Sequence, residues 1–261
     1  MTGKTNLIHP TAIISESAKI HPTAKISPFA VVEGETKIGE NCEVGANAFI
    51  GAGTTLAKGV KIFTGAAIGG ISQDLKFNNE ESFLQVGENT ILREFVTVNR
   101  GTEKGSTTQI GKNCLVMSYT HIAHDCKIGN SVILANSVQM GGYVEIDDFA
   151  GVGGIVPIHQ FVKIGKFAYI GGGYRVPKDV PPFILAAEEP LKFCGLNVVG
   201  LRRRGFSREQ ISELKKIYKT IFSPKLNVQQ ALEKLQTEPD SNEKQEVLNF
   251  IKNSKRGIIS G

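Results

Sequence analysis

The sequence has few cysteines, and their spacing does not suggest a metal site or a disulfide framework. Its 261 residues include four, Cys42, Cys114, Cys126 and Cys194, and no two of them form a C-x-x-C pair. Zinc knuckles and disulfide scaffolds need closely spaced pairs. We therefore expect reduced cysteines, with Cys42, Cys114 and Cys126 buried as small core residues.

Long apolar runs and basic runs are also missing. No stretch of about 18 apolar residues, the length that spans a bilayer, occurs in the chain. The segment Met1–Leu7 lacks the apolar core of a signal peptide. The net charge of +5 fits an anionic substrate, but no basic run carries interleaved aromatics. We expect a soluble, cytoplasmic protein with no transmembrane segment and no nucleic-acid partner.

What the sequence has instead is a repeat of six residues. Counting in sixes from Ile8 to Val176, all but three of 29 positions hold Ile, Val, Leu or Met, and we call these apolar positions the ladder residues. A small residue lies two places before most of them. A period of six fits short strands separated by turns better than a helix or a simple alternating strand. Three such hexads form one triangular coil of a parallel β-helix, whose stacked coils share one core.

The ladder is interrupted twice. Asp74 and Glu80 replace ladder residues in the first interruption and Lys104 does so in the second, which predicts external loops near 73–85 and 100–109. Loops on a rigid solenoid often carry function. Glycine commonly follows a ladder residue directly, as at Gly39, and we expect it there because a corner needs backbone freedom.

The pattern changes after Val176. Prolines end the repeat, and Ser207 followed by Gln210 is a capping-box signal for a helix to about Phe222. Asn227 and Ser241 are further candidate helix starts. We predict an all-β parallel β-helix over 1–190, with the two external loops, and a small C-terminal α-helical domain over 191–261.

Histidines near the middle of the ladder are the candidates for chemistry. Those outside the inward register are His121, His124 and His159. Because three hexads make one coil, Gly142 stacks on His124 and Gln160 stacks on Gly142. A histidine base in one layer and a glycine N–H in the next could serve the proton and the developing oxyanion of one acyl transfer. Asp125, next to His124, could orient it.

Four segments of the chain carry a family resemblance. They are His121–Cys126, Gln73–Lys76, Ile158–Phe161 and Leu201–Glu209, and together they resemble the UDP-N-acetylglucosamine O-acyltransferases, hexapeptide-repeat acyltransferases of lipid A biosynthesis. The resemblance covers nearly the whole chain. It implies that the β-helix is left-handed, which the period alone would not decide.

The resemblance also implies a reaction. A 3-hydroxyacyl group would pass from the phosphopantetheine arm of acyl carrier protein to the 3-hydroxyl of UDP-N-acetylglucosamine, in a cytoplasmic homotrimer with active sites between subunits. His124 would be the general base, Asp125 would support it, and Gly142 would supply the oxyanion N–H. Neither a metal nor another cofactor is expected, because a thioester is already activated.

Further positions match the family's contacts to the sugar nucleotide or the acyl donor. These are Asp74, Lys76, His121, His159, Gln160, Asn197 and Arg203. Gly172 matches the position that gauges acyl-chain length, and glycine there leaves room for a long chain. The chain departs from well-known members at Asn99 and Tyr143, where they carry histidine, and at Val199, where they carry glutamate.

Several alternatives stay open from the sequence. The three departures make the same chemistry on a 3-amino UDP-sugar a hypothesis, and it would form an amide. A related acyltransferase acting on other sugars should carry an added recognition module. A γ-type carbonic anhydrase would hold zinc with three histidines, and the spacings of 3 and 35 residues between His121, His124 and His159 exclude it only in part. A non-catalytic scaffold would leave the stacking of His124 and Gly142 unexplained.

Overall fold

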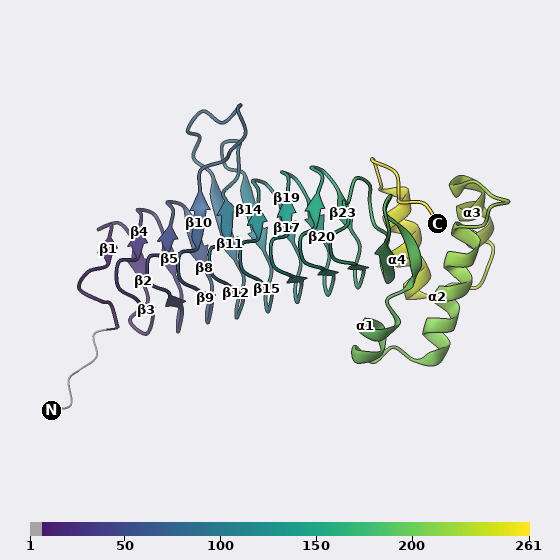
Figure 1. The fold of residues 1–261 in the computed structure, drawn as a ribbon, viewed down its shortest axis with the longest axis horizontal. Coiled ribbons are helices and arrows are strands. Elements are labelled where there is room, and N and C mark those ends of the chain that lie inside the picture. The colour runs from purple at the N-terminus through teal and green to yellow at the C-terminus, as the bar shows by residue number, and fades with distance from the viewer. Residues whose placement is uncertain (1–6) are drawn as a thin grey trace.

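The chain winds into a long three-sided column with helices gathered at its C-terminal end (Figure 1). The structure, a computed structural model, describes residues 7–261. Residues 1–6 lie outside the described residues. The predicted start of the first domain and the prediction that no signal peptide is present both fall there. Within the described part of the chain, no helix is long and apolar enough to cross a membrane.

Each coil of the column contributes one short strand to each of three sheets, which we call faces A, B and C. Face A contains β3 (Lys25–Ile26), β6 (Glu43–Val44), β9 (Lys61–Ile62), β12 (Ile91–Leu92), β15 (Leu115–Val116), β18 (Ile133–Leu134), β21 (Gly151–Val152), β24 (Tyr169–Ile170), β25 (Ile184–Ala187) and β26 (Lys192–Leu196). Face B contains β1 (Ile13–Ile14), β4 (Val31–Val32), β7 (Phe49–Ile50), β10 (Ala67–Gly70), β13 (Thr97–Asn99), β16 (His121–Ile122), β19 (Gln139–Met140) and β22 (Pro157–Ile158). Face C contains β2 (Lys19–Ile20), β5 (Lys37–Ile38), β8 (Thr54–Leu56), β11 (Phe83–Val86), β14 (Thr107–Ile110), β17 (Lys127–Ile128), β20 (Glu145–Ile146) and β23 (Lys163–Ile164).

The ladder residues form the core of the column, as predicted. Partners in neighbouring coils are parallel and 18 residues apart, as Ile13 and Val31 are. From Ile26 onward the ladder residues are buried, and Ile122 is 0% exposed. The three cysteines expected on the small inward register are free and buried, while Cys194 is half-buried. The prediction of a parallel β-helix followed by helices is therefore confirmed.

Two loops leave the column without disturbing the count of six. Ala67 pairs with Thr97, 30 residues on instead of 18, so the first loop adds two hexads. Phe83 pairs with Thr107, 24 residues on, so the second loop adds one. The first loop spans 71–82 and the second 100–106, shorter than the predicted 73–85 and 100–109, because Phe83 and Thr107 already pair as strands of face C.

The expected role of the glycines that follow ladder residues is confirmed at Gly69 (φ 80°) and wrong for the others. The corner residue with positive φ lies two places later, as Asp125 (φ 59°) and Tyr143 (φ 60°) show. At Gly39 the constraint is the neighbouring coil, because a Cβ there would lie 2.9 Å from the carbonyl oxygen of Leu56. Close approach of backbones, rather than backbone freedom, requires this glycine.

Four helices follow the column: α1 (Val198–Arg203), α2 (Arg208–Ile221), α3 (Val228–Gln236) and α4 (Asn242–Lys252). Ser207 and Gln210 form the predicted capping box, and Asn227 and Ser241 are the N-caps of α3 and α4. The short helix α1 was not predicted.

The helices are fastened to the last coils. The antiparallel strands β25 and β26 extend face A, and the boundary predicted at residue 190 falls in the turn between them. The buried Tyr218 hydroxyl donates to the Pro182 carbonyl, and Phe206 packs edge-on against Phe167 and Phe183. The division into two domains at residue 190 stays a prediction.

Candidate active site

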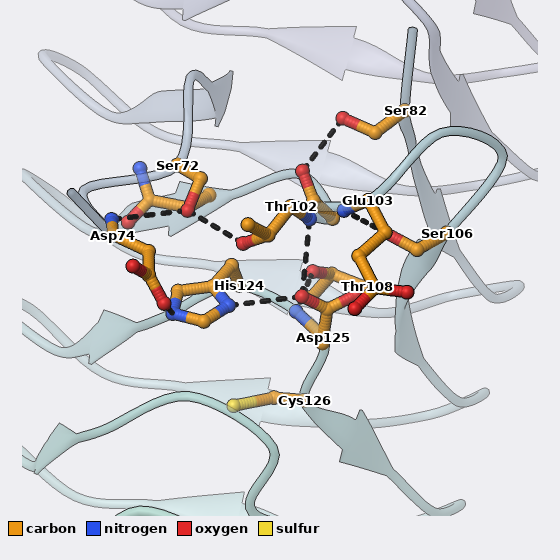
Figure 2. Close-up of polar contacts among 12 residues, drawn as sticks. Ser72, Asp74, Ser82, Thr102, Glu103, Ser106, Thr108, His124, Asp125 and Cys126 are labelled. Atoms are coloured by element: carbon orange, nitrogen blue, oxygen red, sulfur yellow. Dashed lines mark hydrogen bonds and ion pairs between the residues drawn. The ribbon is translucent and has the colours of Figure 1, made fainter. Parts of the chain in front are cut away.

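His124 lies at the corner between faces B and C, after β16 and before β17. The left-handed backbone of Asp125, the next residue, turns the chain there. The His124 side chain points away from the core, yet the residue is only 8% exposed, because residues of both loops lie beside it (Figure 2). The loops therefore convert an outward-facing corner into an enclosed one.

Carboxylates lie near both ring nitrogens of His124. Its Nδ1 is 2.9 Å from Oδ2 of Asp125, and its Nε2 is 3.8 Å from Oδ2 of Asp74 (Figure 2). A proton on Nδ1, donated to Asp125, leaves the lone pair on Nε2. In this tautomer Nε2 is the nitrogen that can accept a proton from a substrate.

Asp125 is held as a carboxylate by its hydrogen bonds. Burial opposes its ionisation, but hydrogen bonds from His124, Ser106 and the Thr102 N–H outweigh burial and lower the pKa of the carboxyl group. The Thr102 N–H donates to Oδ2 over 3.0 Å. A fixed negative charge beside the imidazole stabilises its protonated form, which a general base needs after it takes up a proton.

Gly142 stacks directly against the imidazole, as the coil length predicts. A Cβ on Gly142 would lie 2.5 Å from Cε1 of His124, so no side chain fits there. The neighbouring Tyr143 N–H donates to the His124 carbonyl, whereas the Gly142 N–H donates to no acceptor within residues 7–261. A free backbone donor therefore lies in the layer next to the base.

Aromatic rings form one wall of this corner. Tyr143 meets the His124 ring edge-on, with centroids 5.3 Å apart, and stacks on Phe161. Burial, and then the charge of Asp125, raise the pKa of Tyr143, so its hydroxyl keeps its proton. The Tyr143 ring therefore packs against the imidazole.

A cavity of about 690 Å³ opens beside the corner. Its lining includes three of the predicted contact residues, Asp74, Lys76 and Gln160, together with Tyr143 and Phe161. The loops supply the other lining residues: Glu80, Thr102, Glu103 and Lys104. The three residues that interrupt the ladder all line this cavity, so the interruptions were the sequence signal for the loop residues that the prediction missed.

Two predicted histidines lie close to the corner without lining the cavity. His121 bonds the Thr97 hydroxyl through Nδ1 over 2.8 Å, and burial, followed by the charge of His124, lowers its pKa. His159 is exposed, with Nδ1 3.0 Å from the carbonyl oxygen of Gln160. Their roles as substrate contacts stay predictions.

The remaining predicted contacts lie elsewhere on the chain. A second cavity of about 650 Å³ lies on face A, and Asn197, Val199 and Arg203 line it. The Asn197 side chain caps α1 by accepting from the Gly200 N–H over 3.1 Å. Gly172 follows β24 at the corner between faces A and B and lines neither cavity. One chain thus places Asp74, Lys76 and Gln160 in one cavity and Asn197 and Arg203 in another.

No metal cluster is formed by the residues that the structure describes. Within 7–261, no three His, Cys, Asp or Glu side chains are grouped closely enough to hold a metal ion. A γ-type carbonic anhydrase would share its ligands between subunits, so this alternative is left to a direct test below.

The repeat and its corner histidine define a hexapeptide-repeat transferase. Residues 17–52 and 107–142 match a family profile described as bacterial transferase hexapeptide (six repeats). Residues 179–259 match one described as Udp N-acetylglucosamine O-acyltransferase, domain 2. A relative from Sulfurihydrogenibium, named acyl-(acyl-carrier-protein)–UDP-N-acetylglucosamine O-acyltransferase, is 51% identical over 203 residues, 76% of this chain and 74% of the relative.

Solved structures agree over nearly the full length. The UDP-N-acetylglucosamine acyltransferase of Francisella novicida superposes with a TM-score of 0.94 at 36% identity, covering 97% of this chain and 94% of that one. LpxA from Acinetobacter baumannii gives 0.93 at 38% identity, covering 97% and 99%. The chain belongs to the UDP-N-acetylglucosamine O-acyltransferase family and is an acyltransferase. The left-handed β-helix that the resemblance implied is confirmed.

Proposed function

We propose that this enzyme transfers a 3-hydroxyacyl group from acyl carrier protein to the 3-hydroxyl of UDP-N-acetylglucosamine, the first step of lipid A biosynthesis. The observation that carries the proposal is the pairing of a proton acceptor, Nε2 of His124, with a free donor, the N–H of Gly142, beside one cavity. Acyl transfer to a hydroxyl needs both groups around one carbonyl carbon. The family and the names of the relatives support this choice of substrates.

The mechanism uses only side chains and backbone of this corner. His124 Nε2 takes the proton of the sugar hydroxyl as its oxygen attacks the thioester carbonyl carbon. The Gly142 N–H binds the oxyanion, and Asp125 stabilises the protonated imidazole. The C–S bond then breaks, and the proton passes from His124 to the departing thiolate of phosphopantetheine. The thioester supplies the activation, so we propose no metal and no cofactor beyond the acyl donor.

The outward rows of the three faces support a homotrimer. The residue before each ladder residue points outward. Face A ends in an apolar row: Ile91, Leu115, Ile133, Gly151, Tyr169 and Leu185. Face B begins with one: Ile13, Val31, Phe49 and Ala67. Face C is polar throughout: Lys19, Lys37, Thr55, Gln85, Gln109, Lys127, Glu145 and Lys163. Two faces therefore carry apolar surface that a neighbour could cover, and the third suits solvent.

The corner between faces A and B fits the centre of such an assembly. Its exposed large apolar residues are Phe29 (61%), Phe95 (48%), Tyr119 (58%) and Ile155 (73%). If face A of each chain packs on face B of the next, a closed ring of three places this corner on the three-fold axis. The apolar corner would then be buried together with both faces.

This packing would also unite the two cavities. Where face A of one chain packs on face B of its neighbour, the interface has an edge far from the three-fold axis. At this outer edge the C–A corner of the first chain lies beside the B–C corner of the neighbour. His124 lies at the B–C corner, and the cavity of Asn197 and Arg203 lies on face A in the coils of Ile133 and Gly151, which also hold Gly142. We propose that each active site combines His124 of one chain with Arg203 of the next.

Mixing two inactive variants should restore activity. His124→Ala and Arg203→Glu chains, each inactive alone, should form mixed trimers in which one of the three junctions keeps both wild-type residues, giving up to about a third of the normal activity. The two variants carry different tags, are refolded together, and trimers that hold both tags are assayed for acyl transfer. The control mixes the two intact homotrimers without refolding. No recovery in verified mixed trimers would contradict shared sites.

Transfer assays on the intact protein test the reaction itself. The protein is offered 3-hydroxyacyl carrier proteins of several chain lengths with UDP-N-acetylglucosamine or its 3-amino analogue. A product that mild base cleaves is an ester and supports the proposal, whereas a product formed only with the amino sugar and stable to base supports the amide alternative. Absence of transfer together with stoichiometric zinc and carbon dioxide hydration would replace the proposal with a carbonic anhydrase. The cytoplasmic location stays a prediction.

A further inference from the structure

Two hydroxyl groups join the two loops beside the catalytic corner. Ser72 belongs to the first loop and Thr102 to the second, and their hydroxyl oxygens are 2.7 Å apart (Figure 2). Each residue is 6% exposed, so neither hydroxyl has bulk water as an alternative partner. A buried hydroxyl pair of this kind is costly to break from one side only.

Ser72 is hydrogen-bonded to Asp74, whose carboxylate lies near Nε2 of the imidazole. Its Oγ accepts the Asp74 N–H over 3.2 Å, and this short turn fixes where the Asp74 side chain starts. Oδ2 of Asp74 lies 3.8 Å from Nε2 of His124. The position of Ser72 therefore sets the position of Asp74.

Thr102 is tied to the carboxylate at the other nitrogen. Its N–H donates over 3.0 Å to Oδ2 of Asp125, the same oxygen that lies 2.9 Å from Nδ1 of His124. The contacts form a closed ring that runs from Asp74 through Ser72, Thr102, Asp125 and His124 back to Asp74 (Figure 2). The two loops meet in this ring at the hydroxyl pair alone.

Other bonds hold the loops to the column and to each other without the hydroxyl pair. The Asn99 amide donates to the Ile71 carbonyl over 2.7 Å at the start of the first loop. The Arg100 N–H donates to the Gly70 carbonyl of β10 over 2.9 Å at the start of the second loop, and the Ser82 hydroxyl of the first loop donates to the Gly101 carbonyl of the second over 2.6 Å. Loss of the hydroxyl pair should therefore loosen the ring around His124 while the loops keep their attachment.

We propose that Ser72 and Thr102 are positioning residues, whose hydroxyl pair holds the carboxylates of Asp74 and Asp125 at opposite nitrogens of His124. The inference rests on the proposed role of His124 as general base. Its physical basis is pre-organisation, since a base works only when its accepting nitrogen faces the substrate within a fraction of an ångström. Neither hydroxyl touches the reacting atoms.

The test compares kcat and KM of Ser72→Ala, Thr102→Val, the double variant and Thr102→Ser. We expect kcat to fall about tenfold or more in each of the first two, because a small misplacement of catalytic groups is costly. The double variant should fall no further than the worse single variant, because both changes remove one shared bond. Thr102→Ser, which keeps the hydroxyl, should restore kcat to within about twofold. KM for acyl carrier protein should stay unchanged.

Two controls separate this inference from folding and from the proposed function. Thr36→Val removes another buried hydroxyl, which donates to the Gly51 carbonyl over 3.3 Å in the first coils, and should leave kcat unchanged. Full kcat in Thr102→Val would overturn the hydroxyl pair as a positioning device, and so would independent losses that multiply in the double variant. If His124→Ala is inactive at the same time, the proposed function still stands. An active His124→Ala would overturn the proposed function itself.

Discussion

Replacing His124 with alanine should lower the rate of acyl transfer by about a thousandfold or more. The side chain combines a nitrogen free to accept the hydroxyl proton with a carboxylate neighbour, Asp125, that stabilises the protonated ring. Without it, the sugar oxygen must attack as a neutral hydroxyl. The Gly142 N–H would remain, so the residual rate would report what oxyanion binding and proximity achieve alone. The measurement is kcat/KM for the sugar nucleotide, with acyl carrier protein at a saturating concentration.

A matched control is available in the first coils. His21 is an exposed histidine whose ring nitrogen bonds only the nearby Thr23, so His21→Ala should keep full activity. The His124→Ala variant should stay folded, because two hydrogen bonds of Asp125 remain. The Thr102 N–H still donates to its carboxylate, and its own N–H still donates to the Thr108 hydroxyl. Wild-type activity in a folded His124→Ala would remove this residue from the mechanism.

Adding a single methyl group at Gly142 should have the next largest effect, a loss of about a hundredfold in kcat. The new Cβ would lie 2.5 Å from Cε1 and 2.6 Å from Nε2 of His124, far inside van der Waals contact. The backbone N–H of residue 142 survives the substitution. The loss would therefore come from a displaced imidazole rather than from a missing oxyanion donor, and kcat is the quantity to measure.

Gly34→Ala is the corresponding control. Gly34 also comes second after its ladder residue, at the same corner of the column, but its Cβ would meet the Ser17 hydroxyl at 2.7 Å and the Ser15 hydroxyl at 3.4 Å. Ser17 is exposed, so its hydroxyl can rotate and water can replace its hydrogen bond from the Glu35 N–H, and activity and melting temperature should change little. Near-normal kcat in Gly142→Ala would mean that the imidazole does not pack on Gly142 during catalysis.

The sequence predicted the stacking of His124 and Gly142 because the coil length is fixed by three hexads. Inward positions repeat with little error when stacked backbones must pair, as Ile122 and Met140 do. The same regularity exposed the loops as interruptions at Asp74 and Lys104. Periodic features of the chain were therefore predictable from spacing and residue size.

The loop contacts were not predictable in this way. Ser72 and Thr102 are 30 residues apart and belong to segments without a period, so only the folded loops bring their hydroxyls together. The burial of His124 was missed for the same reason, since the register placed it on an outer corner and the loops then covered it. Helix α1 was missed because it is short and its cap, Asn197, was interpreted as a ligand contact.

The lengths of the two loops have a consequence for how such a catalyst can vary. Each loop adds whole hexads, so the coils on either side continue with the same residues facing inward. The loops that line the active site can therefore change without changing the residues that form the core of the column. A transplant of both loops together would bring Ser72, Asp74 and Thr102 to another column that has its own His124 and Asp125, whereas the first loop alone would lack Thr102.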